Sequence, residues 1–163
     1  MKVWKNNRIW HYRYALLVFA ALACCCAAAY VLFAMPQVPE CRASMRVHNH
    51  DKDAAMERVL LVSIVPEGAR QLTMLMSGSF FDGDTRYVVD RSVEMSYQRR
   101  GSNYTMWVTK NTRKPQDSVI REDMNRRLPI AGQQLHLRIE RIDRHHYLFT
   151  DNHSPLFVCV TGA

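Results

Sequence analysis

Histidine is the residue type with the clearest chemical potential in this chain, and five of its seven histidines fall in two groups. His48 and His50 are two positions apart, so in a strand both side chains would point to one face and could share a metal ion. His145, His146 and His153 lie near the other end of the sequence. If the fold brought the two groups together, the cluster would gain charge between pH 7 and pH 5, as a pH sensor does. A solvated, histidine-bearing surface is the competing interpretation.

Sequence motifs of familiar catalytic chemistry are missing. The chain has no glycine-rich phosphate loop, no nucleophile elbow and no Cys-x-x-Cys pair, and its acidic residues are scattered singly. The basic pairs at 99–100, 113–114 and 126–127 lie in predicted turns or loops without interleaved aromatic residues. They do not form the basic stripe that binds nucleic acids. We therefore expect no enzyme activity, no cofactor and no nucleic-acid partner.

Two of the five cysteines are placed to form a disulfide. Cys24, Cys25 and Cys26 lie within an apolar run, where cysteine packs as a small apolar residue. Cys41 and Cys159 lie at the two ends of the remaining sequence, and in an oxidising compartment they would be expected to pair. Two buried free thiols are the alternative.

A strongly apolar segment near the N-terminus must position everything that follows. Residues 14–34 carry no charged side chain, and at about 1.5 Å per residue they span ~31 Å, the thickness of the hydrocarbon core of a bilayer. Four basic residues and no acidic residue precede this segment, which by the positive-inside rule places the N-terminus in the cytoplasm. Pro36 and Pro39 follow it and stop a helix.

The chain therefore divides into four parts. We expect a cytoplasmic basic tail (1–13), a transmembrane helix (14–34), a linker (35–40) and a periplasmic β domain (41–163). This arrangement is typical of a single-pass protein of the bacterial inner membrane, with the bilayer itself as one partner.

Two other fates of the apolar segment are open. The small residues Ala27-Ala28-Ala29 resemble a signal-peptidase site, and Cys24 with the residues before it resembles the anchor of a lipoprotein. The apolar run is longer than the ~7–15 residues of a signal peptide, which favours an uncleaved anchor.

The net charge of +7 is mainly a signal of topology. Four of the 22 Lys and Arg residues precede the apolar segment, which leaves 18 against all 15 Asp and Glu residues in the rest of the chain. The remaining domain is therefore close to neutral, and its charge gives no indication of a nucleic-acid partner.

Alternating polarity predicts that this domain is built from strands. The clearest strand is 86–98, in which Val89, Val93 and Tyr97 fall on one face and polar residues fall on the other. One buried face and one wet face indicate an antiparallel sheet. Arg91 lies on the apolar face, so it should find a partner there or lie at the rim.

Seven further stretches are strand-like, and most are separated by tight turns: 41–47, 59–65, 72–81, 104–109, 135–141, 147–150 and 156–160. Residues 48–53 are predicted as a polar connection. Residues 110–128 are predicted as either a short helix capped by Asp117 or a charged loop with one helical turn. The fold class is therefore mainly β, or α+β, with an antiparallel meander that forms a small barrel or a sandwich.

Several short motifs of the domain are similar to those of a known family. They are Cys41, Ser-Gly-Ser-Phe at 77–80, Val-Asp-Arg-Ser-Val-Glu-Met-Ser-Tyr at 89–97, Tyr-Leu-Phe at 147–149 and Ser-Pro-Leu-Phe-Val-Cys at 154–159. With the basic start and the single anchor, they make the chain resemble the FidL-like family of small enterobacterial inner-membrane proteins. The resemblance implies an inner-membrane protein without established catalysis. The three consecutive cysteines in the anchor depart from the family pattern.

The expected function is that of an accessory or binding protein of the envelope. The layout of a short tail, one helix and an outer domain is similar to that of the small partners of membrane-bound transcription regulators of the ToxR type, and such a regulator is one candidate partner. The alternative is an envelope enzyme or small-molecule carrier, which would show a deep pocket lined by groups such as Asp90, Arg91 and Tyr97.

Overall fold

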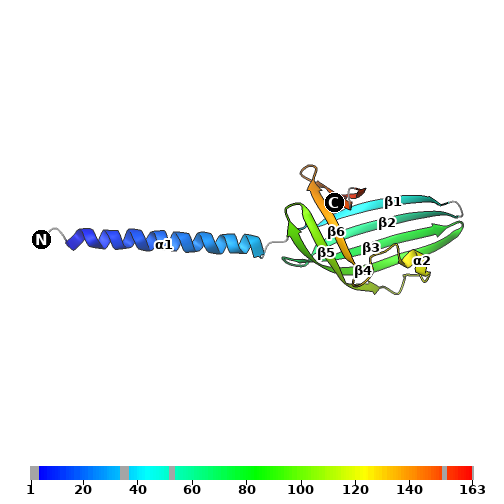
Figure 1. Ribbon diagram of the computed structural model, residues 1–163, viewed down its shortest axis with the longest axis horizontal. Coiled ribbons are helices and arrows are strands. Elements are labelled where there is room, and N and C mark those ends of the chain that lie inside the picture. The colour runs from blue at the N-terminus through cyan, green and yellow to red at the C-terminus, as the bar shows by residue number, and fades with distance from the viewer. Residues whose placement is uncertain (1–3, 34–36, 52–53, 152–153, 163) are drawn as a thin grey trace. The chain divides into compact units, whose positions relative to one another are not determined.

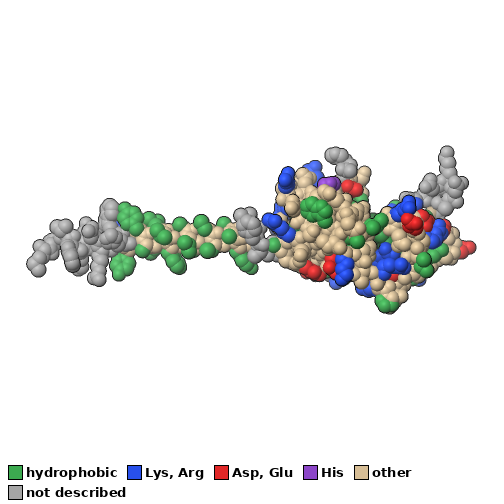
Figure 2. Space-filling view, turned by 60° about the horizontal axis from the view of Figure 1, so that its bottom comes forward, with side chains coloured by type: hydrophobic (Ala, Val, Ile, Leu, Met, Phe, Trp, Pro, Cys, Tyr) green, Lys and Arg blue, Asp and Glu red, His purple; other side chains and the backbone are tan. Residues whose placement is uncertain are grey.

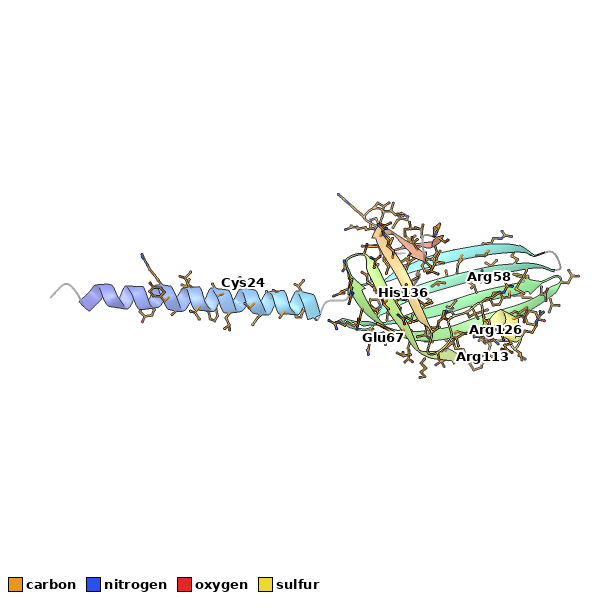
Figure 3. The ribbon with its side chains drawn as sticks, in the orientation of Figure 1. Cys24, Arg58, Glu67, Arg113, Arg126 and His136 are labelled. Atoms are coloured by element: carbon orange, nitrogen blue, oxygen red, sulfur yellow. A yellow bond between two sulfur atoms is a disulfide. The ribbon has the colours of Figure 1, made fainter. Side chains whose placement is uncertain are left out.

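The computed structural model describes residues 4–33, 37–51, 54–151 and 154–162. Two compact units make up the chain, residues 1–35 and 36–163. The first contains one helix, α1 (Trp4–Phe33), and the stretch Tyr12–Val31 within it is long and apolar enough to cross a membrane. The helix begins ten residues before Tyr14, so the basic residues Lys5, Arg8 and Arg13 belong to it rather than to an extended tail. Its free cysteines Cys24–Cys26 are exposed on the helix surface (Figure 3).

The second unit is an eight-stranded antiparallel barrel with one short helix (Figure 1). The strands are β1 (Cys41–Asp51), β2 (Ala54–Pro66), β3 (Gln71–Asp82), β4 (Thr85–Arg100), β5 (Asn103–Arg113), β6 (Gln134–Arg141), β7 (His146–Asp151) and β8 (Ser154–Val160), and α2 (Glu122–Asn125) lies between β5 and β6. Each strand pairs with the next in sequence, and β8 returns to β1. The predicted mainly β meander is confirmed, and its closure makes it a barrel rather than a sandwich.

Alternation within each strand fills the barrel with apolar side chains. In β4, for example, Val89, Arg91, Val93 and Met95 are buried, while Asp90, Ser92 and Glu94, which alternate with them, are partly exposed. The largest fully buried side chains come from several strands and the β5–β6 connection, and include Tyr97, Phe80, Phe149, Ile64, Met106 and Met124. The interior is therefore a packed core, as expected for a barrel of this strand number.

Gly78 permits a close approach of β2 and β3. A Cβ atom at this position would lie 2.1 Å from the carbonyl oxygen of Val59, far inside any van der Waals contact. Only glycine fits there, because the atom in the way belongs to the main chain and cannot rotate aside. The glycine of the Ser-Gly-Ser-Phe motif is thus explained by packing.

The strands differ greatly in length, and the long ones project beyond the short ones. β1 to β4 have 11 to 16 residues, whereas β6, β7 and β8 have 6 to 8. The prediction of a polar connection over 48–53 was wrong for residues 48–51, which continue β1 and pair with β2 as far as Asp51 and Ala54. Their polar character did not reveal this, because pairing with β2 depends on the main chain and not on side-chain polarity.

The β5–β6 connection packs against the long strands. Val119, Met124 and Leu128 are 0–2% exposed and join the core, and Figure 1 shows α2 beside the far part of these strands. The helix is a single turn whose N-cap residue is Arg121, so the helix capped by Asp117 was wrong and the loop with one helical turn is correct. Asp117 has another role, described below.

The chain enters the barrel before β1 begins. Val38 is 2% exposed in the core, although residues 35–40 were expected to be a linker. The Gln37 N–H donates to the Tyr97 hydroxyl at 3.2 Å, and the Tyr104 hydroxyl donates to the Gln37 carbonyl at 2.9 Å. The Tyr97 hydroxyl also donates to the carbonyl of Ala69 at 3.0 Å. Residues 37 and 38 are therefore a fixed part of the barrel.

Candidate interaction surface

A disulfide closes the barrel between its first and last strands. Cys41 and Cys159 are bonded, with Cα atoms 5.5 Å apart and a sequence separation of 118, which confirms the predicted pair. Next to this bond, Arg42 and Val160 form the bridge between β1 and β8. The two cysteines are 3% and 0% exposed, so the bond lies inside the closed end of the barrel.

Beyond this bridge, β1 and β8 separate. Within the described residues, Arg42–Val160 is the only paired position of the two strands, although β1 continues for nine more residues and β8 extends back to Ser154. We call the stretch of β1 from Ser44 to His50 that faces β8 from Ser154 to Val158 the open seam. Among the described residues, no strand pairs with this side of the β1 main chain beyond Arg42.

The opposite edge of the long sheet is covered by the chain itself. After β5 leaves β4 at Arg113, residues 114–118 run along the rest of β4. Lys114 N–H donates to the Asp90 carbonyl at 3.0 Å and Ser118 N–H donates to the Val88 carbonyl at 2.9 Å, while Val88 N–H donates to the Ser118 hydroxyl at 2.8 Å. One edge of the sheet is thus protected and the other is open.

A buried ion pair holds this covering segment in place. The Arg91 Nε atom lies 2.7 Å from Oδ2 of Asp117, and the two side chains are 5% and 0% exposed. Arg91 also donates to the Asn125 side-chain oxygen at 2.6 Å, and Arg113 approaches Asp117 at 3.1 Å. Asp117 is therefore the partner that we expected Arg91 to find on the apolar face.

Asp117 is held in its charged form by several donors. Burial alone raises the pKa of this carboxyl, but hydrogen bonds from Arg91 and from the N–H groups of Asp90 and Val119 outweigh burial and lower the pKa below its ordinary value. The cluster joins β4, the β5 end and α2. The charged groups of Arg91, Arg113 and Asp117 pair with one another. We call this cluster the lock, because it holds the covering segment against β4.

The groups that a ligand pocket would have used do not converge. The Asp90 carboxylate pairs with Lys114 at 3.1 Å, Arg91 binds Asp117, and the Tyr97 hydroxyl bonds the main chain near Gln37. These three residues therefore do not line a common deep pocket, which the alternative function of an enzyme or small-molecule carrier would need.

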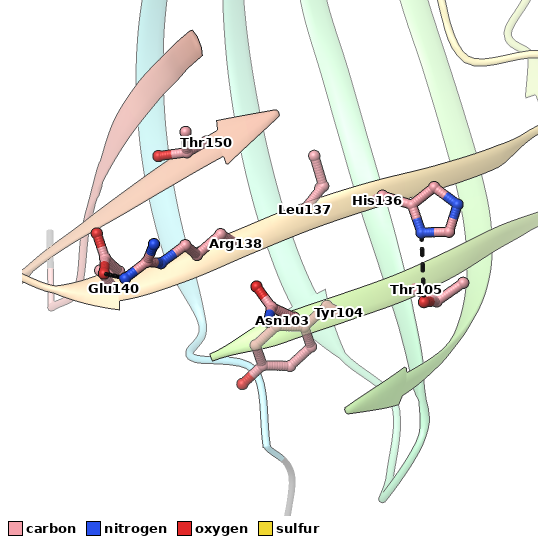
Figure 4. A pocket seen from close by; sticks show the side chains of 8 residues that line it. All are labelled: Asn103, Tyr104, Thr105, His136, Leu137, Arg138, Glu140 and Thr150. Carbon is pink, nitrogen blue, oxygen red and sulfur yellow. Dashed lines mark hydrogen bonds and ion pairs between the residues drawn. The ribbon is translucent and has the colours of Figure 1, made fainter. Parts of the chain in front are cut away.

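A shallow polar groove of about 610 Å³ crosses β5, β6 and β7 (Figure 4). It is lined by Asn103, Tyr104, Thr105, His136, Leu137, Arg138, Glu140 and Thr150. Arg138 Nη2 lies 2.5 Å from Oε1 of Glu140, so the acid among these residues is already neutralised. His136 lies 3.4 Å from the Thr105 hydroxyl. The groove can hydrogen-bond a polar surface but offers no uncompensated acid for catalysis.

The fold places His146 far from His48, two of the histidines that the sequence grouped. His146 pairs with Val160, next to the start of β1, whereas His48 lies six residues further along β1 than Arg42. At ~3.3 Å per residue this is about 20 Å along the strand. The side chains of His48 and His50 and the whole of His153 lie outside the described residues. The described part of the chain contains no group of three or more His, Cys, Asp or Glu side chains able to hold a metal ion.

The β6–β7 turn is organised by Asp143 rather than by its histidines. The His145 N–H donates to the Asp143 carboxylate at 2.8 Å and the His146 N–H does so at 2.9 Å. The His146 Nδ1 atom also lies 2.9 Å from this carboxylate. The main-chain bond from His145 contributes most and the bond from the His146 side chain comes next, and together the bonds lower the pKa of Asp143 to about 2. The carboxylate therefore stays ionised between pH 7 and pH 5, and the turn keeps these bonds over the range in which a histidine sensor would act.

Charges on the outer surface are mixed rather than concentrated. The face of the barrel in Figure 2 shows Lys and Arg side chains among Asp and Glu side chains. Many are paired, as in Arg46–Glu57 at 2.5 Å and Lys110–Glu94 at 3.4 Å. Arg113 and Arg126, labelled in Figure 3, lie near α2, where Arg126 pairs with Glu122 at 2.7 Å. This pattern agrees with the near-neutral charge of the domain.

The sequence interpretation missed Asp117, Asp143 and the polar groove. No local pattern marks Asp117, because its partner Arg91 is 26 residues away. Asp143 was detectable, since an Asp two residues before a turn residue commonly accepts the N–H groups that follow it. The open seam was not detectable, because it depends on where β8 ends relative to β1.

Comparison with known families agrees with this architecture. A family model described as "FidL-like putative membrane protein" matches residues 78–159, just over half of the 163-residue chain. The match runs from Gly78 in β3 to Cys159 in β8 and contains the motifs at 89–97, 147–149 and 154–159. No curated protein matches the chain. The resemblance seen in these motifs is confirmed, and the chain belongs to the FidL-like family of membrane proteins.

Proposed function

We propose that this protein is a membrane-tethered binding module: a non-catalytic, accessory partner of another envelope protein, such as a membrane-bound transcription regulator. The observation that supports this most is that the disulfide-closed barrel is filled by packed side chains. Binding would therefore take place on its outer surface. A single apolar helix precedes it, and tethering to the same membrane raises the effective concentration for a membrane partner.

The same features argue for binding rather than catalysis. The interior is filled by side chains such as Phe80 and Phe149, and the buried charges of Arg91 and Asp117 compensate each other. The polar groove has its acid, Glu140, paired with Arg138. What the barrel presents is hydrogen-bonding surface and an unpaired strand edge.

We further propose that the protein spans the bacterial inner membrane once, with the N-terminus in the cytoplasm and the barrel in the periplasm. The basic residues before the apolar stretch support this orientation, and the disulfide is a bond of oxidising compartments. Single cysteines test it. In intact cells with a permeabilised outer membrane, a membrane-impermeant maleimide should label Thr112→Cys on the exposed part of β5, and should label Asn7→Cys only after lysis.

The unmodified protein is the control for this labelling. Its Cys41 and Cys159 are bonded and buried, and Cys24–Cys26 lie in the apolar stretch, so it should remain unlabelled. Labelling of Asn7→Cys from outside, with Thr112→Cys protected until lysis, would invert the topology and overturn the periplasmic assignment.

Photo-crosslinking in cells tests the partner. A photoreactive phenylalanine analogue placed singly at Leu61 on β2, His136 in the polar groove or Leu156 on β8 samples three exposed parts of the barrel. At one or more positions we expect a light-dependent product that contains a second envelope protein, identified by mass spectrometry. The same analogue at buried Met106 is the control and should give none. Failure of all three exposed positions would contradict the accessory function.

A further inference from the structure

We propose that the open seam is a docking site for one extended, acidic segment of an envelope protein, which adds to the free edge of β1 as an antiparallel or parallel strand. This inference rests on the proposed function, because it names the surface used and the chemistry of the partner segment. It is supported by the direction of the β1 main chain, by the lack of edge protection and by charge.

The main chain of β1 is directed into the open seam. Every second residue of an antiparallel strand turns its N–H and C=O groups away from its paired neighbour. Arg42 turns these groups toward β8, where it bridges to Val160, so Ser44 and Arg46 are the next residues to do so. A row of such groups without a partner is a template for another strand.

β1 carries exposed charges at Arg42 and Arg46 but lacks the other features that usually protect a strand edge. From Cys41 to His50 it contains no proline, glycine, lysine or acidic residue, and its pairing with β2 has no bulge. β8 is different, because it carries Pro155 and because its pairing with β7 has a register shift between Phe149 and Thr150. Because proline cannot donate to a ladder, β1 is the better template of the two.

Apolar side chains border the open seam on both faces. Leu156 and Val158 of β8 are 41% and 42% exposed on the outer face, and Met45 and Val47 of β1 are partly exposed on the inner face. Side chains of an added strand alternate between the two faces, so both sets would lose exposed surface when the strand binds.

Charge favours an acidic segment. Arg42 is exposed on β1, and Arg58 lies half-buried on β2, directly opposite Val47. In the described part of the chain no carboxylate pairs with either guanidinium. Burial of Arg58, with added repulsion from Arg127, lowers its pKa, which is the effect of a guanidinium without a counter-ion. A segment carrying Glu or Asp would supply the missing charge.

The same charges disfavour a second copy of this chain. Two β1 strands paired antiparallel about Ser44 would place Arg42 of one copy directly opposite Arg46 of the other. Like charges in directly opposed positions destabilise a strand pair. The seam therefore suits a partner of opposite charge and not itself.

The test uses the full-length protein in cells, with the photoreactive analogue at Leu156 on the border of the open seam. The expected product contains an envelope protein crosslinked through an extended, acid-bearing peptide. Arg42→Glu should lower its yield roughly fivefold, because it replaces attraction by repulsion. The matched control is Arg100→Glu, the same change at the exposed last residue of β4, and it should leave the yield unchanged.

Ser44→Pro provides the second variant. It removes an N–H that faces the open seam and not β2, so it should abolish the product while the Cys41–Cys159 disulfide still forms. If this variant fails to fold, Arg42→Glu against Arg100→Glu still decides the question.

Any of three results with the analogue at Leu156 would overturn the proposal: equal yields for Arg42→Glu and Arg100→Glu, crosslinks between two copies of this chain, or a basic or helical crosslinked peptide. Products from His136 but none from Leu156 would also overturn it while leaving the accessory function intact. Absence of products at every exposed position would reject both.

Discussion

Replacing Cys41 and Cys159 together by serine should lower the free energy of unfolding by about 4–5 kcal/mol. The bond closes a loop across a sequence separation of 118 residues, so its loss greatly increases the conformational entropy of the unfolded chain. The native barrel also loses support at its weakest junction, because Arg42–Val160 is the only paired position described between β1 and β8. Urea unfolding of the full-length protein in detergent, followed by Trp107 fluorescence, measures the change.

Replacing Cys24, Cys25 and Cys26 together by alanine is the control for this experiment. These cysteines are free and belong to α1, outside the barrel, so the unfolding midpoint reported by Trp107 should be unchanged. Wild-type protein treated with a reducing agent should approach the serine variant. Equal stability of the oxidised wild type and the serine variant would show that the bond does not support the barrel.

Asp117→Asn should destabilise the protein by about 3–5 kcal/mol, because it leaves the charge of Arg91 buried without its counter-charge. The side chains of both residues are 5% exposed or less, so water cannot replace the lost partner. The control is Glu94→Gln, the same chemical change in the exposed pair Lys110–Glu94, for which a loss of ~1 kcal/mol or less is expected. Equal losses in the two variants would contradict the role of the lock.

The effect of Asp117→Asn should depend on pH. Because the pKa of Asp117 is lowered in the folded state, its contribution is fully present above its unfolded pKa of about 3.9 and is lost as the pH falls toward the folded value. The difference in stability between the wild type and the variant should therefore shrink below about pH 4. Unfolding midpoints measured from pH 7 to pH 3 test this, and a constant difference would show that another group carries the effect.

Local patterns in the sequence were sufficient for the strands and the apolar helix. The alternation around Val89–Tyr97 records which side chains face the core, so strand and burial can be read from the residues themselves. The charge-free stretch before Pro36 likewise predicts an apolar helix and its approximate length from the residues alone. The pairing of Cys41 with Cys159 followed from their positions and the expected compartment, and the structure confirms it.

Contacts between distant residues were beyond such patterns. Asp117 looked like a helix cap, yet it binds Arg91, and this choice depends on where β5 ends and the following segment crosses β4. The two histidine groups could form one cluster only if the fold brought them together, and the strand register places His146 far from His48.

The sequence by itself determined an apolar helix and a meander of eight strands, because each depends on residue type and short-range order. It also indicated the Cys41–Cys159 pair, because these are the two cysteines outside the apolar helix. The tertiary structure alone decided that the sheet closes into a barrel, that Arg91 and Asp117 lock the covering segment, and that the seam beside β1 stays open. The physical reason is that closure depends on how far two strands distant in sequence stay side by side. Among the described residues, β1 and β8 are paired only at Arg42 and Val160, and no pattern within either strand indicates where this pairing stops.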